Sequence, residues 1–559
     1  MVDIRLKRSN ICMLCNRQLF PLNLTKFPGM TLKELVKYAT RHRVKRDVSM
    51  FKNTMLKRTG EVRDAPLHLM VRVLVQTGQQ SQILFVAKEV ETSMATKRDL
   101  ERRDGIRAPL VSHGERKENN CMVYISTFVA VCGAYSFGTG VGYSSPTEAA
   151  IKKDLKLTMA EYSLFGSILT FGAMIGAIAS GPMADFFGRK GALRISSVFC
   201  IGGWLAIYNG QGPIPLDIGR LAQGFGMGVF SYVVPVFIAE IAPKQLRGLL
   251  TAANQLLIVT GVSVSFVIGT ILHWRTMALA GLIPCGILLL GLFFIPESPR
   301  WLAKIGKQQE FDSALRKLRG EEIDVSEEAA EIREYIETLD KLPQASLIDL
   351  FQSTYLSSVI IGVGLMISQQ FGGINGICFY ASSIFASSGF PADVGTVIYA
   401  VLQVVVTTLN ALLIDKLGRK PLLLVSLVGM TLGCLSTAAS FYFKTHQIAL
   451  GVAPSLAVTG ILLYIAGFSI GMGAVPWVIM SEIFSINIKG TAGGLVTLVN
   501  WAGAWAVSYT FNFLSNWSSY GTFLLYAAVN VCSILFVIKT VPETKGKTLE
   551  QIQAAISAH

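Results

Sequence analysis

Carboxamide side chains lie near the middle of several long apolar stretches of this chain, where polar groups are costly to bury. A carboxamide offers one carbonyl acceptor and two N–H donors, and it carries no charge. Such groups suit a ligand whose hydroxyls both donate and accept hydrogen bonds. Single amides of this kind equally often join neighbouring helices in a membrane. Six of them on several stretches favour a shared binding cavity, formed by Gln255, Gln369, Gln370, Asn375, Gln403 and Asn500.

Two tryptophans in the same stretches are candidates for an apolar ligand face. Trp477 follows Pro476, and a proline inside a helix can bend it and make it a moving gate. Trp501 directly follows Asn500, so it shares the position of that amide along the chain. The alternative for either ring is a packing role, or a place at the membrane interface. We favour a binding role for Trp477 and weigh the two interpretations equally for Trp501.

The elements that must position these residues are membrane helices. Of the 559 residues, 51% are hydrophobic and 15% are charged, whereas soluble domains carry about 25% charged residues. A helix needs about 20 apolar residues to cross a bilayer, and the chain offers twelve such stretches. The seventh, which contains Gly372 and Gly373, is too long for one straight helix and is expected to break there. The stretches are 121–142, 162–182, 192–210, 216–241, 250–272, 275–296, 356–388, 394–414, 421–443, 456–482, 491–514 and 521–541.

The charges predict how the chain is divided and oriented. Loops after the second, fourth and eighth stretches are basic, as is the polar segment between the sixth and seventh, so both termini and that segment are expected in the cytosol. Its Glu, Ala and Lys content favours helix. The predicted division is a basic, mostly disordered N-terminal segment (1–118), a six-helix bundle (119–297), an intracellular helical linker (298–350), a second six-helix bundle (351–543) and a short cytosolic tail (544–559).

Most of the net charge of +14 belongs to the N-terminal segment, where 24 Lys and Arg stand against 12 Asp and Glu. A nucleic-acid partner is not expected, because neither a zinc finger nor a basic region with heptads accompanies this charge. Cys12 and Cys15 form a lone CxxC without a second pair. We therefore expect no metal site, no cofactor, no catalytic residues and no enzymatic activity.

The two halves of the apolar region repeat each other in sequence. An Asp-x-x-Gly-Arg-Lys motif follows the second and the eighth stretch, a Glu-Ile pair ends the fourth and the tenth, and Pro-Glu-Ser or Pro-Glu-Thr follows the sixth and the twelfth. Parallel duplication of six spans is the architecture of major facilitator transporters. The predicted fold is therefore an all-α membrane protein of the major facilitator type. The motifs begin at Asp185, Asp415, Glu240, Glu482, Pro296 and Pro542.

With these motifs the chain resembles the sugar porters of the major facilitator superfamily, over about residues 120–555. The Pro-Glu-Ser-Pro-Arg-Trp run at 296–301, the Gln-Gln-x-x-Gly-Ile-Asn run at 369–375 and the Pro-Glu-Thr-Lys-Gly-Lys run at 542–547 carry the likeness. The sequences at 235–243 and 471–477 are similar to those of the early-responsive-to-dehydration-like monosaccharide transporters of plants. The resemblance implies a hexose as the small-molecule partner, a lipid bilayer as the surroundings and a vacuolar or plasma membrane as the location. We expect a monomer.

The resemblance also assigns roles to residues. The amides named above and Trp501 occupy positions whose counterparts contact sugar, except that relatives often have Asn where Gln403 stands. Charged residues at the cytosolic ends of the helices are implied to form an ion-pair network that latches one conformation, with ordinary solvated charge as the alternative. That network would comprise Asp185, Arg189, Arg220, Glu240, Arg247, Glu297, Arg300, Asp415, Arg419, Glu482, Lys489 and Glu543.

Whether transport is coupled to protons is predicted from the absence of an acidic residue in the first span. Proton-driven sugar porters usually place a carboxylate midway along the first span, but residues 133–142 contain none. A buried carboxylate is the natural proton carrier, so facilitated diffusion is the favoured reading. Proton symport or antiport through another acid is the alternative. A sugar sensor that moves no substrate is a weaker one, because only about a dozen residues follow Lys547.

Overall fold

The computed structural model describes residues 120–547, with gaps at 244, 321–322, 341–347 and 486–487, together with three short N-terminal strands and residues 551, 552 and 556. The chain separates into two units, 1–115 and 116–559. In the first unit, β1 (Ile11–Cys15) pairs antiparallel with β2 (Gln18–Leu22) and parallel with β3 (Met70–Val71). The rest of the segment predicted to be disordered lies outside the described residues.

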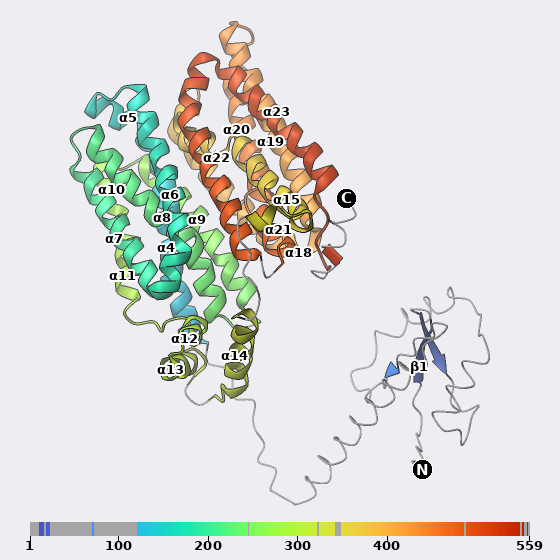
Figure 1. Ribbon diagram of the computed structural model, residues 1–559. Coiled ribbons are helices and arrows are strands. Elements are labelled where there is room, and N and C mark those ends of the chain that lie inside the picture. Colours follow the sequence, from blue (N-terminus) through green and yellow to red (C-terminus); the bar gives the residue numbers. More distant parts are fainter. Residues whose placement is uncertain are drawn as a thin grey trace, which may run out of the picture. The chain divides into compact units, whose positions relative to one another are not determined.

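The second unit is helical, and Figure 1 shows its helices as two groups, blue to green and yellow to red. Helix breaks at Tyr143, Phe187 and Gly210 each fall at a glycine or next to one. The first group consists of α4 (Cys121–Gly142), α5 (Ser144–Leu155), α6 (Met159–Phe186), α7 (Gly188–Asn209), α8 (Pro213–Ile241), α9 (Arg247–Gly269), α10 (Trp274–Ala280) and α11 (Leu282–Gly291).

The second group repeats the first, and its first span is broken as the sequence predicts. Gly372 ends one helix, and Gly373 adopts a positive φ of 103°, which glycine tolerates better than other residues. The group consists of α15 (Ser353–Phe371), α16 (Ile374–Phe379), α17 (Ala381–Ser388), α18 (Ala392–Leu417), α19 (Arg419–Thr445), α20 (Ala453–Ile470), α21 (Val475–Ile483), α22 (Lys489–Trp517) and α23 (Ser519–Thr540).

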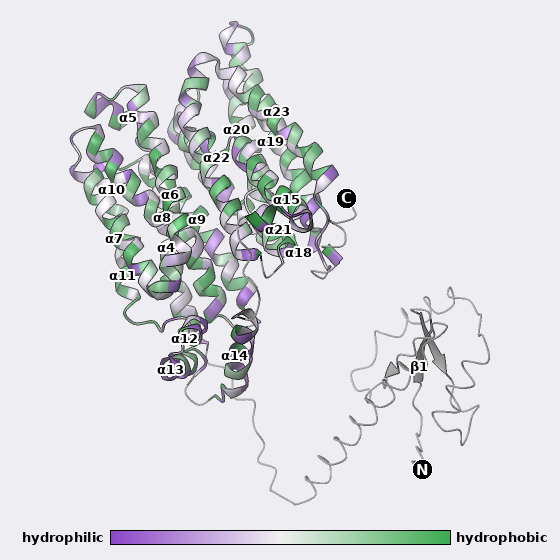
Figure 2. Ribbon diagram, in the orientation of Figure 1, coloured by the Kyte–Doolittle hydropathy of each residue, from purple (hydrophilic) through white to green (hydrophobic). Residues whose placement is uncertain are grey.

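The polar segment between the groups folds into the predicted helical module. It contains α12 (Pro299–Lys304), α13 (Gln308–Arg319), α14 (Ser326–Asp340) and the short η2 (Ile348–Phe351). Its small core includes Leu302, Phe311 and Leu315. Figure 2 shows purple, hydrophilic residues gathered on α12–α14 and green, hydrophobic residues along the long helices. We call this end of the bundle the module end.

Among the described residues, eleven helices or helix pairs are long and apolar enough to cross a membrane. The predicted span 491–514 corresponds to α22, whose 29 residues also suffice, but which is less apolar than the other eleven. Two of its polar residues are buried, Asn500 at 5% and Ser508 at 0% exposed. The long helix α6 lies against α8 because glycines let the backbones approach, and a Cβ added at Gly176 would meet the Phe225 carbonyl oxygen at 2.0 Å. The fold is that of the major facilitator transporters.

Candidate functional site

A hydrogen-bonded cluster of four carboxamides lies where α15 breaks. Gln370 Nε2 donates to Asn500 Oδ1 on α22 over 2.6 Å and to Gln369 Oε1 over 3.2 Å. Asn375 Nδ2 donates to Gln370 Oε1. Because Gly372 and Gly373 interrupt the helix, Asn375 reaches the same cluster from α16. We call Gln369, Gln370, Asn375 and Asn500 the amide cluster.

The amide cluster is buried and joined to a second helix break. Three of its members are 3–6% exposed, and Asn375 is half-buried. Gln369 Nε2 donates to the carbonyl of Met472, which lies between α20 and α21. All hydrogen bonds within the cluster involve neutral groups. Its amides could therefore exchange these bonds for bonds to a hydroxylated ligand without leaving a charge unpaired.

The other two predicted amides lie apart from these bonds. Gln403 on α18 is 6% exposed, and its Oε1 has no hydrogen-bond partner among the described residues. Gln255 on α9 is half-buried, and none of the bonds described for the amide cluster includes it. The buried Tyr399 hydroxyl, one turn before Gln403, interacts only weakly, with the thiol of Cys378. These orphaned polar atoms are candidates for contact with a ligand or water.

The two predicted tryptophans differ in their surroundings. Trp501 is 7% exposed, and its ring lies 5.8 Å from that of Phe137 on α4, so it bridges the two groups of helices. Together with Ala173 and Ala504 it forms a small apolar cluster. Trp477 is half-buried at the start of α21, where Pro476 occupies the first turn of the helix. Proline there begins the helix and does not bend its interior.

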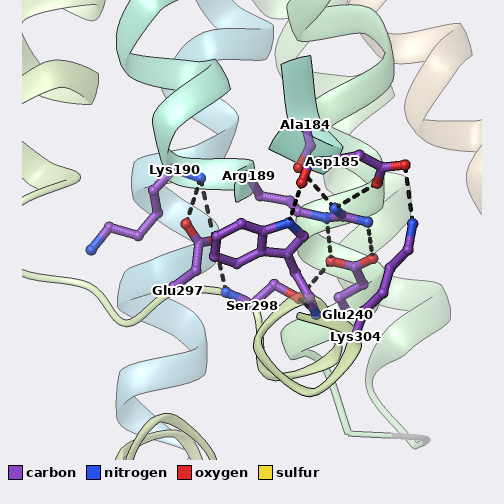
Figure 3. Close-up of polar contacts among 9 residues, drawn as sticks. Ala184, Asp185, Arg189, Lys190, Glu240, Glu297, Ser298 and Lys304 are labelled. Carbon is purple, nitrogen blue, oxygen red and sulfur yellow. Dashed lines mark hydrogen bonds and ion pairs between the residues drawn. The ribbon is translucent and has the colours of Figure 1, made fainter. Parts of the chain in front are cut away.

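At the module end, the first group carries a compact ionic cluster (Figure 3). Arg189 forms two parallel bonds to Glu240, from Nε and from Nη2, each of 2.8 Å. The same guanidinium donates to the Ala184 carbonyl and lies 3.3 Å from Asp185 Oδ1. Ser298 Oγ donates to Glu240 Oε2 over 2.6 Å. This bidentate arrangement fixes the junction of α6 and α7 to the end of α8.

Glu297 closes the same junction through backbone groups. Its carboxylate accepts from the Lys190 N–H over 3.1 Å and from the Ser298 N–H over 2.8 Å. A Cβ at Gly188, where φ is 78°, would stand 2.7 Å from Glu297 Oε2. Burial raises the pKa of Glu297, and the hydrogen bonds from the Ser298 and Lys190 amides oppose the shift.

The second group repeats the arginine–glutamate contact and the backbone bonds of this cluster. Arg419 Nη2 donates to Glu482 Oε1 over 3.0 Å, and the Arg419 and Lys420 amides donate to Glu543 over 3.0 and 3.1 Å. A Cβ at Gly418, with φ of 94°, would meet Glu543 Oε2 at 2.8 Å. Burial raises the pKa of Glu543, but four backbone N–H donors outweigh it and the net pKa is lowered. The repeat seen in the sequence is therefore also a repeat in bonding.

The expectation that Arg220 belongs to this ionic network is wrong. Arg220 is fully buried near the start of α8, about 30 Å of helix away from Glu240. Its guanidinium donates to the Gly140 carbonyl over 2.7 Å and to the Ser144 hydroxyl, and it lies over the Phe165 ring. Arg220 lies near the start of the predicted stretch 216–241, at the end opposite Glu240, so its position in the sequence already disagreed with this assignment.

The remaining predicted network residues lie near the module end without joining either cluster. Arg300 lies over the Tyr335 ring of α14 at 5.3 Å, and Arg247 is within electrostatic range of Glu328. Lys489 donates to the Ser481 carbonyl over 3.0 Å. The side chain of Asp415 lies outside the described ones. The Arg189–Glu240 and Arg419–Glu482 contacts each join residues of a single group of helices.

Bonds between the two groups gather instead near α5, at the opposite end from the module. Ser145 Oγ bonds the Ser382 hydroxyl and amide, and Ser383 Oγ donates to Glu148 Oε2 over 2.5 Å. Glu148 is 4% exposed and also pairs with Lys152 Nζ at 2.8 Å. Sequence reasoning missed these residues because α5 was taken for a loop. The Lys152–Glu148 spacing of four residues was the available signal for a helix. Further bonds between the groups join Thr170 to Ser508, Ser163 to Asn512 and Ser263 to the Ala400 carbonyl.

A family model described as "Sugar (and other) transporter" matches residues 120–556. The chain belongs to this sugar transporter family. Two relatives of the transporter in Arabidopsis thaliana are Sugar transporter ERD6-like 7, 66% identical over 81% of this chain and 99% of the relative, and Sugar transporter ERD6-like 16, 59% identical over 79% and 92%. The family assignment and the likeness to the early-responsive-to-dehydration branch are thus confirmed.

Solved structures agree with the family. The transporter is similar to the proton:xylose symporter XylE bound to 6-bromo-6-deoxy-D-glucose, with a TM-score of 0.64 and 29% identity over 78% of this chain and 99% of that one. It is also similar to the inward open conformation of XylE from E. coli, with a TM-score of 0.64 and 28% identity over the same shares. The transporter is a multi-pass membrane protein that carries sugar.

Proposed function

We propose that the transporter moves monosaccharides of the hexose type by alternating access, without coupling to protons. The amide cluster would bind the sugar, with Gln255, Gln403, Trp477 and Trp501 completing the site around it. The observation that carries this proposal is the convergence of four buried neutral amides from α15, α16 and α22. A sugar hydroxyl can replace each amide–amide bond with a bond of similar strength. The sugar can therefore bind without being held too tightly for release.

Alternating access is supported by where the two groups of helices are bonded to each other. The hydrogen bonds named above join them at the α5 end, as between Glu148 and Ser383, whereas the Arg189–Glu240 and Arg419–Glu482 contacts each lie within one group. This pattern fits a state closed at the α5 end. In the other state, closed at the module end, charged residues of the two groups would form ion pairs with each other and stabilise that state. Arg247 and Lys489 are available as partners.

Facilitated diffusion is supported by the neutral surroundings of Arg220. Its bonds go to the Gly140 carbonyl, the Gln223 amide oxygen and the Ser144 hydroxyl, and aromatic rings cover it. A buried cation of this kind would be the natural partner for a proton-carrying carboxylate, yet a serine stands beside it.

Two observations favour the alternative of proton coupling. The similar structure XylE is titled a proton:xylose symporter, and Glu148 is a buried carboxylate one helical turn after Ser144.

We further propose that the transporter works as a monomer in the vacuolar or plasma membrane, with both termini in the cytosol. The basic loops at the module end support this orientation. The experiment that tests the function uses the purified full chain in liposomes, with a panel of labelled sugars. Hexose uptake that is unchanged by a proton gradient is the expected result. Uptake that needs the gradient would replace facilitated diffusion by symport or antiport, and binding without uptake would indicate a sensor.

A further inference from the structure

Three basic side chains converge on the chain just after α11, at the module end. Lys190 Nζ donates to the Ile295 carbonyl over 2.5 Å, and Arg194 Nη2 donates to the Leu292 carbonyl over 3.1 Å. Lys317 Nζ on α13 donates to the Phe294 carbonyl over 3.3 Å. Lys190 lies within electrostatic range of the other two positive charges. In Figure 3 the Lys190 side chain points away from Arg189 and Glu240, so it is not part of the ionic cluster.

Capping of α11 explains only part of this arrangement. The carbonyl end of a helix carries about half a negative charge, which one cation balances. The second group makes the comparison possible, because Lys420 alone repeats the Lys190 contact by donating to the Ile538 carbonyl over 2.9 Å. The residue that corresponds to Arg194 there, 230 positions on, is Leu424. The fold thus forms this junction without the extra arginine.

Among the described residues, the positive charges are only partly compensated. Glu297 is within electrostatic range of Lys190, and its oxygens already accept from the backbone amides of Lys190 and Ser298. Arg194 Nε is buried without a hydrogen-bond partner among the described residues, so the arginine acts on an anion through its charge and its outer nitrogens. Each lysine ammonium has three donors, of which one goes to a carbonyl. Donors and positive charge are therefore left over for an anion.

Two exposed aromatic side chains mark the depth of this cluster in the bilayer. Phe293 and Phe294 are 64% and 74% exposed and directly follow the last apolar helix of the first group. Arg194 lies over the Phe293 ring at 4.7 Å. Exposed rings at the end of a membrane helix meet lipid near the headgroup level. An anion reaching Lys190, Arg194 and Lys317 would thus lie at the level of the phospholipid phosphates.

We propose that Lys190, Arg194 and Lys317 form a binding site for the headgroup of an anionic phospholipid in the leaflet next to the module. The lysines and arginine contact the headgroup phosphate, whose negative charge no cationic headgroup neutralises, and Phe293 and Phe294 contact the glycerol and acyl region of the lipid. A lipid held there would also link α7 to α13, because Lys317 belongs to the module. This site is separate from the amide cluster and does not depend on the sugar that is carried.

The test is native mass spectrometry of the full chain, released from nanodiscs that contain equal amounts of phosphatidylglycerol and phosphatidylcholine. The wild type is expected to retain phosphatidylglycerol preferentially. Charge near a membrane surface contributes about 1 kcal/mol per basic residue, so the double variant R194Q/K317Q is expected to reduce that preference about tenfold or more. The control is K307Q, an exposed lysine of the same module that pairs with Glu310.

Two results would overturn the proposal. The first is equal retention of both lipids by the wild type, or the same preference in wild type and double variant. The second is loss of the retained lipid on adding millimolar inorganic phosphate, which would indicate a site for a soluble anion. Sugar uptake by the double variant serves as the check that it is folded. If the double variant does not fold, R194L, which copies the second group at Leu424, replaces it and is expected to lower the preference severalfold.

Discussion

Gln370 on α15 donates from Nε2 to Asn500 Oδ1 on α22 over 2.6 Å, across the interior of the second group of helices. The same side chain bonds Gln369 and Asn375. It is the member of the amide cluster with the most partners, and it holds the broken helix against α22. A sugar that enters the cluster must exchange these bonds for its own, which keeps the affinity modest.

We expect that Q370A and N375A each reduce hexose uptake about tenfold at low sugar concentration. A neutral hydrogen bond contributes roughly 0.5–1.5 kcal/mol, and each substitution removes one or more bonds that the sugar would make. Initial uptake rates in proteoliposomes measure the effect. Q308A, an exposed glutamine on α13, is the matched control and should transport at the wild-type rate. Wild-type rates in both Q370A and N375A would count against the site.

The ionic clusters of the two groups predict unequal effects of the same substitution. Arg189 and Glu240 form a pair whose side chains are 10% and 14% exposed, whereas the side chains of Arg419 and Glu482, in contact at 3.0 Å, are 13% and 26% exposed. Removing one partner of a buried pair costs about 3–5 kcal/mol, and much less when the pair is solvated. E240Q should therefore lower the unfolding temperature more than E482Q does. Thermal unfolding of detergent-purified protein measures the difference. Equal losses would show that the difference in burial has no energetic consequence.

The sequence predicted much of this arrangement for identifiable reasons. Long apolar stretches predict membrane helices by length alone, and Gly372–Gly373 predicted the break that lets Asn375 join Gln370. The repeated Gly-Arg-Lys and Pro-Glu motifs predicted two equivalent junctions, because a glycine with positive φ leaves room for the carboxylate of Glu297 or Glu543.

Other features depended on contacts between distant segments. Arg220 was misplaced because its partners, Gly140 and Ser144, lie about 80 residues away in sequence and are neutral. The contact of Glu148 with Ser383 spans 235 positions and joins two helices from different halves. No local sequence pattern predicts contacts between such distant residues. The cation cluster at Arg194 was missed for the same reason, since its partners are backbone carbonyls.

Ser144 offers a direct test of the coupling mechanism. Its hydroxyl accepts a bond from the fully buried Arg220. In S144D a carboxylate would face this cation, and the charged pair could break for transport only when the acid takes up a proton. We expect that a proton gradient accelerates sugar uptake by S144D and leaves the wild type unchanged. S144N, which keeps a neutral acceptor, is the control. If S144D folds, binds sugar and ignores the gradient, the buried cation has no part in coupling.

Glu297 and Glu543 occupy equivalent positions in the two repeats, and they predict opposite dependences of stability on pH. Burial raises the pKa of Glu297 above its ordinary value of 4.5, so the folded state holds the proton more tightly than the unfolded state does. The stability that this group contributes is therefore present below pH 4.5 and is lost as the pH rises through the folded pKa. Backbone N–H donors overcome burial and lower the pKa of Glu543, so its contribution is present above pH 4.5 and is lost as the pH falls.

Thermal unfolding of the wild type, E297Q and E543Q between pH 4 and pH 7 measures this contrast. Relative to the wild type, E297Q should gain in unfolding temperature as the pH rises, because glutamine needs no proton to remain neutral in the buried junction. E543Q should lose most at pH 7, where the wild-type carboxylate accepts its full set of backbone bonds, and least near pH 4. Each variant is the control for the other, since both remove one carboxylate from equivalent junctions. Parallel pH curves for the two variants would mean that burial does not distinguish the two repeats.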